Sequence, residues 1–102
     1  MAADRAIQRT LSFDGVVDFL SAPAIQTHGV ELISDDGVQV LVVDMSGLTF
    51  IDSSGLSLLV YLKGRCDERH IELELRSVPA RARGLIDSLG LSAYFELPTE
   101  PS

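Results

Sequence analysis

The chain of 102 residues contains one cysteine, no tryptophan and few basic residues. A single cysteine, Cys66, excludes an internal disulfide. Because no secretory signal peptide is evident either, we expect a reducing, cytoplasmic setting. No apolar run approaches the roughly 18 residues that span a bilayer, so we expect no direct membrane insertion. His28 and His70 stand alone, without a cluster of cysteine or histidine, and no metal site is predicted.

Positive charge is also scarce. Lysine and arginine number 8 against 15 acidic residues, which gives a net charge of −7 and a pI near 4.5. A nucleic-acid binder would need a basic face, so nucleic acid is not an expected partner. Solubility, and a protein partner with a basic surface, fit this balance better.

The rest of the composition is that of a globular protein. Hydrophobic residues make up 46% of the chain and charged residues 23%, which is not typical of disorder. The sequence contains neither internal repeats nor a linker. At this length we expect one domain, residues 1–102, with short polar ends and enough chain to form a hydrophobic core.

Three segments have the periodicity of β-strands. Residues 7–13 alternate between apolar and polar types, which predicts a half-buried strand that residues 16–17 could extend. Residues 38–44 are almost continuously apolar and β-branched, which predicts a central strand buried on both faces of a parallel sheet. Residues 71–77 alternate again and predict a one-sided strand near a sheet edge. The tail, residues 94–102, could add another short strand.

Two of the three expected helices are marked by their ends. Ser21 can cap a helix that has Pro23 in its first turn, although Gly29 weakens this helix. Another helix has Pro79 in its first turn and ends at Gly90, a predicted left-handed residue just past the helix.

The remaining helix is predicted to begin near Ser54. Its apolar residues form two rows, one made of Leu56, Leu59 and Val60 and the other of Leu58, Leu62 and Cys66. The resulting order of strand, helix, strand, helix, strand, helix predicts parallel strands joined by right-handed crossovers. We therefore expect a small α/β domain with helices packed against one sheet.

A polar segment, Asp52, Ser53, Ser54 and Gly55, stands where the middle one of the three expected helices begins. The first three are all good N-cap types, although a cap needs only one of them. A phosphate is favourable at a helix N-terminus, so a serine here could carry one at small structural cost. Gly55 would let another protein's active site approach closely. A simple helix cap is the alternative interpretation.

The serines do not fit the pattern of a catalytic nucleophile. A G-x-S-x-G elbow needs glycine two residues before the serine, where this chain has Ile51 before Ser53 and Asp52 before Ser54. No local motif supplies a histidine base, and no G-x-x-x-x-G-K-[ST] phosphate loop is present. We therefore expect no enzyme, no catalytic residue and no cofactor.

Three segments together carry a family resemblance. They are "VLVVDMSGLTFIDSSGLSLLVYLK" at 40–63, "LRSVPARARGLIDSLGLSAYFEL" at 75–97 and "FDGVVDF" at 13–19. They resemble STAS domains, and in particular the anti-sigma factor antagonists of bacterial partner-switching systems. The resemblance covers about residues 9–97 and is most specific at D-S-S-G-L. It implies a STAS-like fold, with a mostly parallel or mixed sheet of four to five strands and helices packed against it.

The resemblance also implies a function. Ser54, with Ser53 as the alternative acceptor, would be phosphorylated by an anti-sigma factor that is a serine/threonine kinase with a histidine-kinase-like ATPase fold. The unphosphorylated domain would bind this kinase and release a sigma factor, and phosphorylation would end the binding. Whether a phosphatase resets the serine stays open. The expected partner-binding residues are Asp18, Asp52, Ser53, Ser54, Gly55 and Leu56.

A second function stays open at this point. STAS domains also occur as non-phosphorylated binding subunits of ABC-type lipid-transport complexes. The doubled serine favours the anti-sigma factor antagonist, because STAS subunits of transport complexes often have another residue in place of the acceptor serine.

Overall fold

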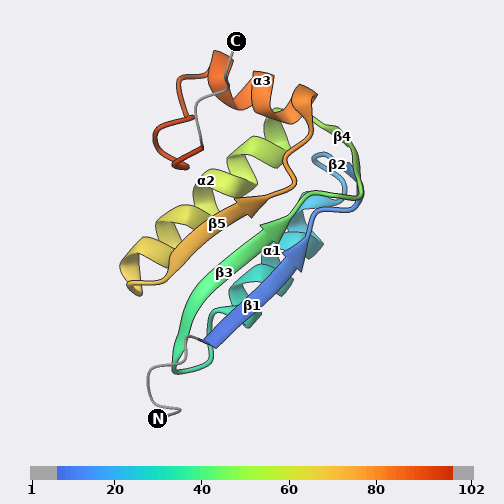
Figure 1. Cartoon of the computed structure of the whole chain (residues 1–102). Helices are drawn as coiled ribbons and strands as arrows, with labels where there is room; N and C mark the ends of the chain where they lie inside the picture. The colour runs from blue at the N-terminus through green and yellow to red at the C-terminus, as the bar shows by residue number, and fades with distance from the viewer. Residues whose placement is uncertain (1–6, 98–102) are drawn as a thin grey trace.

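The computed structural model describes residues 7–97 and shows an α/β arrangement of five strands and three helices (Figure 1). The leader 1–6 and the end of the tail, 98–102, lie outside the described residues. In chain order the elements are β1 (Ile7–Ser12), β2 (Gly15–Val17), α1 (Ala22–Leu32), β3 (Val38–Asp44), β4 (Leu48–Ile51), α2 (Ser53–Glu68), β5 (Glu72–Arg76) and α3 (Ala80–Ser88).

The strands form two parallel sheets. The larger one has the order β1-β3-β5, and the smaller one pairs β2 with β4. Leu11 lies opposite Val43, and Leu41 lies opposite Leu73, so apolar residues of all three strands meet on one face. The expected central position of 38–44 and the edge position of 71–77 are confirmed.

A bend separates the two sheets. The amide of Phe13 donates to the carbonyl of Asp44 at 2.9 Å, and the amide of Gly15 donates to that of Gly47 at 2.9 Å. Chain pairing therefore continues from β1 with β3 into β2 with β4. Hydrogen bonds from Ser46 hold the carboxylate of Asp44 in this turn and lower its pKa. The sequence had not predicted β4, because it is only four residues long and Thr49 and Phe50 are exposed.

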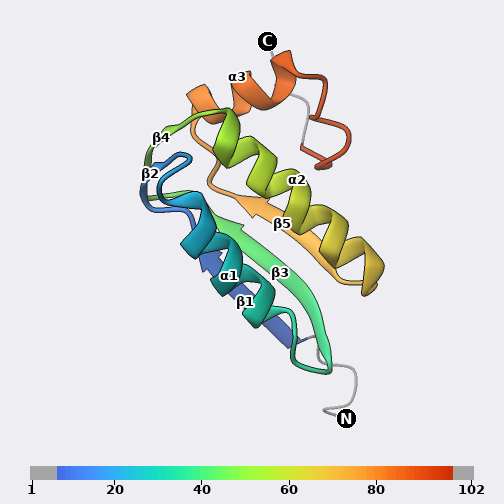
Figure 2. The same cartoon turned by 180° about the vertical axis from the view of Figure 1, so that it is seen from behind.

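Two helices cover one face of the larger sheet. Helices α1 and α2 lie side by side on this face, behind the strands in Figure 1 and in front of them in Figure 2. A Cβ atom on Gly29 would lie 2.9 Å from Cδ2 of Leu62, so the glycine in the middle of α1 lets the two helices approach closely. The main core fills the space between helices and sheet, with Leu11, Phe13, Leu41, Val43, Leu59 and Leu62 among its members.

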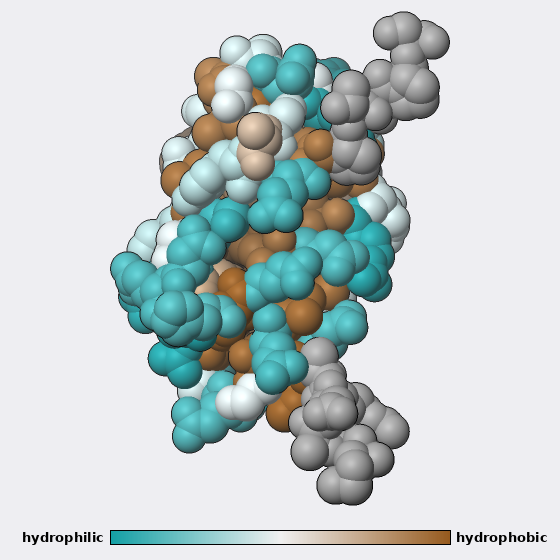
Figure 3. All heavy atoms as spheres, turned by 60° about the vertical axis from the view of Figure 1, so that its left-hand side comes forward, coloured by the Kyte–Doolittle hydropathy of each residue, from teal (hydrophilic) through white to brown (hydrophobic). Residues whose placement is uncertain are grey.

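Helix α2 faces the core with both predicted rows, with one exception. Leu58, Leu62 and Cys66 are buried, as are Leu56 and Leu59. Val60 is 37% exposed, so its assignment to the core face is wrong; it lies beyond the edge of the buried stripe. Charged residues follow toward the end of α2. The face of the molecule in Figure 3 carries hydrophilic side chains interspersed with hydrophobic ones.

The helix ends agree only in part with expectation. Ser21 stands at the N-cap position of α1 but does not cap it. Its hydroxyl oxygen accepts the amide of Asp18 at 3.0 Å instead of a helix amide, and its proton is donated to the carbonyl of Val16 at 2.9 Å. Gly90 follows α3 with φ of +73°, and the amides of Gly90 and Leu91 donate to carbonyls of Asp87 and Ile86. The predicted left-handed conformation of Gly90 is confirmed, and the two hydrogen bonds form a Schellman motif.

The prediction of a strand within residues 94–102 is wrong for residues 94–97, the part that the structure describes. Residues 92–96 form turns, and the amide of Phe95 donates to the carbonyl of Leu91 at 3.0 Å. Glu96 has φ of +56°, which is incompatible with an extended strand. The ring of Phe95 is buried in the core, so hydrophobic burial is achieved here without strand pairing.

The packing of α2 leads to a stability prediction. Leu59→Ala should lower the free energy of unfolding by about 2–5 kcal/mol, because a fully buried side chain is lost and a cavity remains. Val60→Ala, one position further on the exposed side, should change it by less than about 1 kcal/mol. Urea denaturation of both variants measures the difference. Equal losses at the two positions would contradict the observed orientation of α2.

Candidate functional site

Asp52 alone caps the helix that begins at the D-S-S-G segment. Its Oδ1 accepts the amide of Ser54 at 2.8 Å and that of Gly55 at 3.3 Å. Its own amide donates to the carbonyl of Val17 at 3.4 Å, which holds the residue at the end of the β2–β4 pair. Because the carboxylate satisfies two helix amides, neither serine hydroxyl is needed as a cap.

The two serines differ in their surroundings. Ser53 is exposed, whereas Ser54 is half-buried and lines a groove of about 640 Å³ between the N-terminal parts of α1 and α2. We call this the Ser54 groove. Its other lining residues are Phe19, Ala22, Pro23, Gln26, Thr27, Ser57, Leu58 and Tyr61. None of them is charged.

Gly55 and Leu56 lie beneath the site rather than on its surface. Gly55 is buried, and a Cβ atom there would collide with Cγ1 of Ile51 and lie 3.1 Å from Cγ1 of Val17. Leu56 is only 2% exposed. The glycine is therefore required by packing against β2 and β4, and not to open the site to another protein as the sequence suggested. Both residues support the surface that Ser53 and Ser54 form.

Asp18 organises the turn that leads from β2 into α1. Its Oδ1 accepts the amides of Leu20 at 3.0 Å and Ser21 at 3.2 Å. This turn displays Phe19, which is 67% exposed, and Leu20, which is 76% exposed. Phe19 lines the Ser54 groove, so the structure brings the turn that Asp18 holds and the D-S-S-G segment to one surface.

Sequence reasoning missed Phe19, Leu20 and Tyr61. Two adjacent apolar residues between Asp18 and Ser21, in a turn rather than in a periodic segment, were the available signal. They point outward because a short turn with two amides bonded to Asp18 leaves no buried face for them. Tyr61 carried no such signal, since it lies within the apolar part of α2.

Other reactive groups lie elsewhere. Cys66 is buried, and desolvation raises the pKa of its thiol to about 11. Within residues 7–97, no three histidine, cysteine, aspartate or glutamate side chains are grouped so as to hold a metal ion. In the same part of the chain, no helix has both the length and the apolar character needed to cross a membrane.

The arrangement defines a class of protein: a small α/β domain with a parallel sheet, helices on one face and a hydroxyl displayed at a helix N-terminus. The family model of the STAS domain matches residues 3–102, and the chain belongs to this family. A search of curated proteins finds no match.

Several solved structures are similar. An anti-sigma factor antagonist from Mycobacterium paratuberculosis is 26% identical with a TM-score of 0.71, over 97% of this chain and 81% of that chain. A sulfate transporter family protein from Wolinella succinogenes is 19% identical with a TM-score of 0.74, over 93% and 79%. The unphosphorylated anti-sigma factor antagonist SpoIIAA is 18% identical with a TM-score of 0.66, over 78% and 73%. The last two, at these identities, show the shared fold alone.

The cap makes a prediction about stability. Asp52→Ala should lower the free energy of unfolding by about 0.5–2 kcal/mol, because two amides of α2 lose their acceptor. Asp52→Asn keeps an acceptor oxygen and should recover most of the loss. Ser53→Ala is the control and should be close to neutral. Thermal or urea unfolding measures all three, and a loss at Ser53 as large as that at Asp52 would contradict the assignment of the cap.

The buried thiol makes a second prediction. At pH 8 the folded protein should react with a thiol reagent such as DTNB only slowly, because the thiol of Cys66 is buried and its pKa of about 11 keeps it protonated. Addition of denaturant should make the reaction fast. Since the folded pKa is raised from 9.0, this group stabilises the folded state fully below pH 9 and loses that contribution as the pH rises toward 11. Rapid labelling without denaturant would contradict the burial.

Proposed function

We propose that the chain acts as a single STAS module, residues 1–102, and works as an anti-sigma factor antagonist. The observation that carries the proposal is the position of Ser54. It lies at the N-terminus of α2, where Asp52 caps the helix, so its hydroxyl is not used as a cap. It lines an uncharged groove beside exposed apolar residues. The similarity to the Mycobacterium paratuberculosis antagonist supports the same function.

The surface around Ser54 suits a protein partner. Phe19 and Leu20 are exposed beside the groove, and adjacent exposed apolar side chains are typical of protein interaction sites. We propose that the partner is an anti-sigma factor serine/threonine kinase with a histidine-kinase-like ATPase fold. Asp18, Asp52, Ser53 and Ser54 would lie at this interface, with Gly55 and Leu56 supporting it from below.

Phosphorylation of Ser54 would change this surface without unfolding the domain. A phosphoserine adds about −1.5 to −2 charge at neutral pH. The N-terminus of α2 favours negative charge, so the modified helix stays stable. A partner packed on the uncharged Ser54 groove would instead have to bury that charge, next to the carboxylate of Asp52, without a counter-ion from the groove. Binding would be lost while the fold is kept.

In this proposal the chain is a cytoplasmic binding module, and the chemistry belongs to the partner kinase. The γ-phosphoryl group passes from the kinase's ATP to Oγ of Ser54; its bond to the bridging oxygen of ATP breaks, ADP leaves, and the hydroxyl proton of Ser54 is released. A sulfate transporter family protein has the same fold, so binding to a transport complex is the competing function. The identity of the partner protein distinguishes the two functions.

The acceptor serine can be tested directly. With the cognate kinase and labelled ATP, Ser54→Ala should abolish phosphate incorporation, while Ser53→Ala should keep most of it. Both variants should fold, because neither hydroxyl caps α2. Phosphopeptide mass spectrometry locates the site. Full incorporation into Ser54→Ala, with loss in Ser53→Ala, would move the acceptor to Ser53.

The switch can be tested by binding. Wild type, Ser54→Asp and Ser54→Asn serve as parallel baits in a lysate of the source organism, with captured proteins identified by mass spectrometry. Wild type and Ser54→Asn should capture an ATPase of the histidine-kinase-like type, and Ser54→Asp should bind it at least about tenfold more weakly because of the added charge. Capture of the same ABC-type ATPase by all three baits would contradict the proposal and favour the transport function.

A further inference from the structure

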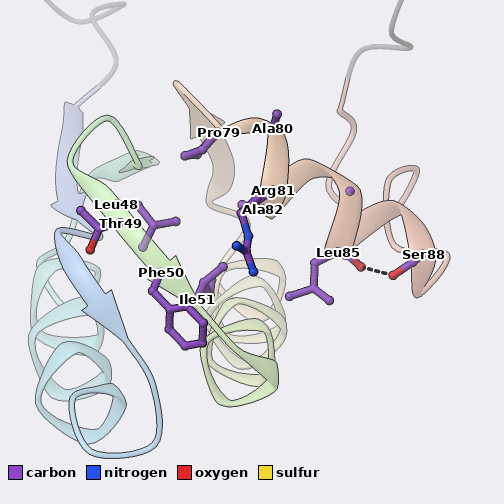
Figure 4. A pocket seen from close by; sticks show the side chains of 11 residues that line it. Leu48, Thr49, Phe50, Ile51, Pro79, Ala80, Arg81, Ala82, Leu85 and Ser88 are labelled. Atoms are coloured by element: carbon purple, nitrogen blue, oxygen red, sulfur yellow. Dashed lines mark hydrogen bonds between the residues drawn. The ribbon is translucent and has the colours of Figure 1, made fainter.

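A second groove, of about 530 Å³, lies between β4 and α3 (Figure 4). We call it the β4–α3 groove. Leu48, Phe50 and Ile51 contribute to its wall on β4, and Pro79, Ala82 and Leu85 contribute to the opposite wall. It is separate from the Ser54 groove, with which it shares no lining residue.

The groove results from the bend in the sheet. β5 pairs with β3 and ends at Arg76, and it does not continue beside β4. Within the described residues β4 therefore pairs with β2 alone, and its other edge faces α3 across open space. Phe50 is exposed for this reason, although phenylalanine is usually buried.

One cation lies in this groove. Arg81, at the start of α3, extends its guanidinium into the space between the two walls (Figure 4). No lining residue is acidic, and none of the ion pairs formed within residues 7–97 uses Arg81. Arg81 is exposed, so its guanidinium is open to a ligand from solvent, and in a chain of net charge −7 it offers a local site for an anion beside the apolar residues of the groove.

The remaining polar groups are few. The hydroxyl of Ser88 already donates to the carbonyl of Leu85 at 2.9 Å, which leaves the hydroxyl of Thr49 as the other side-chain donor of the lining. Pockets of roughly 300–1,000 Å³ with apolar walls and a few polar groups are typical of small-molecule sites. One cation in a mostly apolar lining matches a ligand with one anionic group and an aliphatic chain.

We propose that the β4–α3 groove binds a small amphiphilic anion, namely a linear aliphatic carboxylate. Its carboxylate is paired with the guanidinium of Arg81, and its chain lies against Phe50 and Leu85. This site is independent of the function proposed for Ser54, because it involves neither α1 nor the first turn of α2.

The chain offers matched variants for a test with decanoate. Arg81→Gln removes the cation. Arg69→Gln is the control and removes the same charge at the C-cap of α2, the end of this helix that is opposite to β4; the 16 residues of α2 span about 24 Å. Gly84→Leu adds a side chain to the groove lining, where a Cβ atom meets nothing within 4 Å. Gly64→Leu makes the same change on α2, where a Cβ atom is equally unobstructed. Neither glycine variant should prevent folding, because leucine favours helix over glycine.

The measurement is a ¹H–¹⁵N NMR titration of the unphosphorylated, partner-free protein with decanoate, with decanol as the uncharged probe. We expect saturable shifts of the amides of Phe50, Ile51, Ala82 and Leu85. Affinity should fall about tenfold or more in Arg81→Gln and be lost in Gly84→Leu, with both controls unchanged. Absence of shifts in the groove, equal affinity for decanol, or equal effects of Gly84→Leu and Gly64→Leu would overturn the proposal. Because no kinase is present, the result does not depend on the function of Ser54.

Discussion

The strands β1, β3 and β5 end at the same edge of the larger sheet. The hydrogen bonds at this edge set the direction in which the chain continues. The amide of Met45 donates to the carbonyl of Arg76, and that of Phe13 donates to the carbonyl of Asp44, at the last residues of the strands. Within residues 7–97, two strands continue beyond this edge as β2 and β4, in a direction set by the bend. The D-S-S-G segment follows β4, so its position relative to α1 is decided by hydrogen bonds at the end of the larger sheet.

Within this segment the four residues have separate tasks. Asp52 satisfies the amides of the helix terminus, Gly55 permits contact with Ile51, and the two serines remain for other uses. For the phosphorylation that we propose at Ser54, rigid support matters, because a phosphoryl group then changes charge at a defined place instead of reorganising a loop. Asp18 provides similar support on the neighbouring turn, where its carboxylate holds the backbone that displays Phe19.

The two grooves, which lie near β4 and α2, differ in the polarity and charge of their linings. The Ser54 groove has an uncharged lining with several hydroxyl and amide side chains, and it adjoins exposed apolar residues. The β4–α3 groove is more apolar and contains a single guanidinium. An uncharged groove beside projecting apolar side chains suits a protein, whereas an apolar groove with one cation suits a small anion. β4 thus lines the β4–α3 groove and leads into the D-S-S-G segment, whose Ser54 lines the other groove.

The sequence by itself determined the elements with strong local signals. Residues 38–44 are β-branched and apolar throughout, so they predicted the central strand, and Gly90 predicted the end of α3 because few other residues adopt its left-handed conformation. The D-S-S-G-L segment located the candidate site. Tertiary structure alone decided which of three capping residues caps α2, that Val60 is exposed, and that Phe95 is buried in a turn. It also decided the placement of Phe19 and Arg81 beside grooves. These features depend on contacts between segments distant in the chain, and periodicity reports only on a residue's own helix or strand.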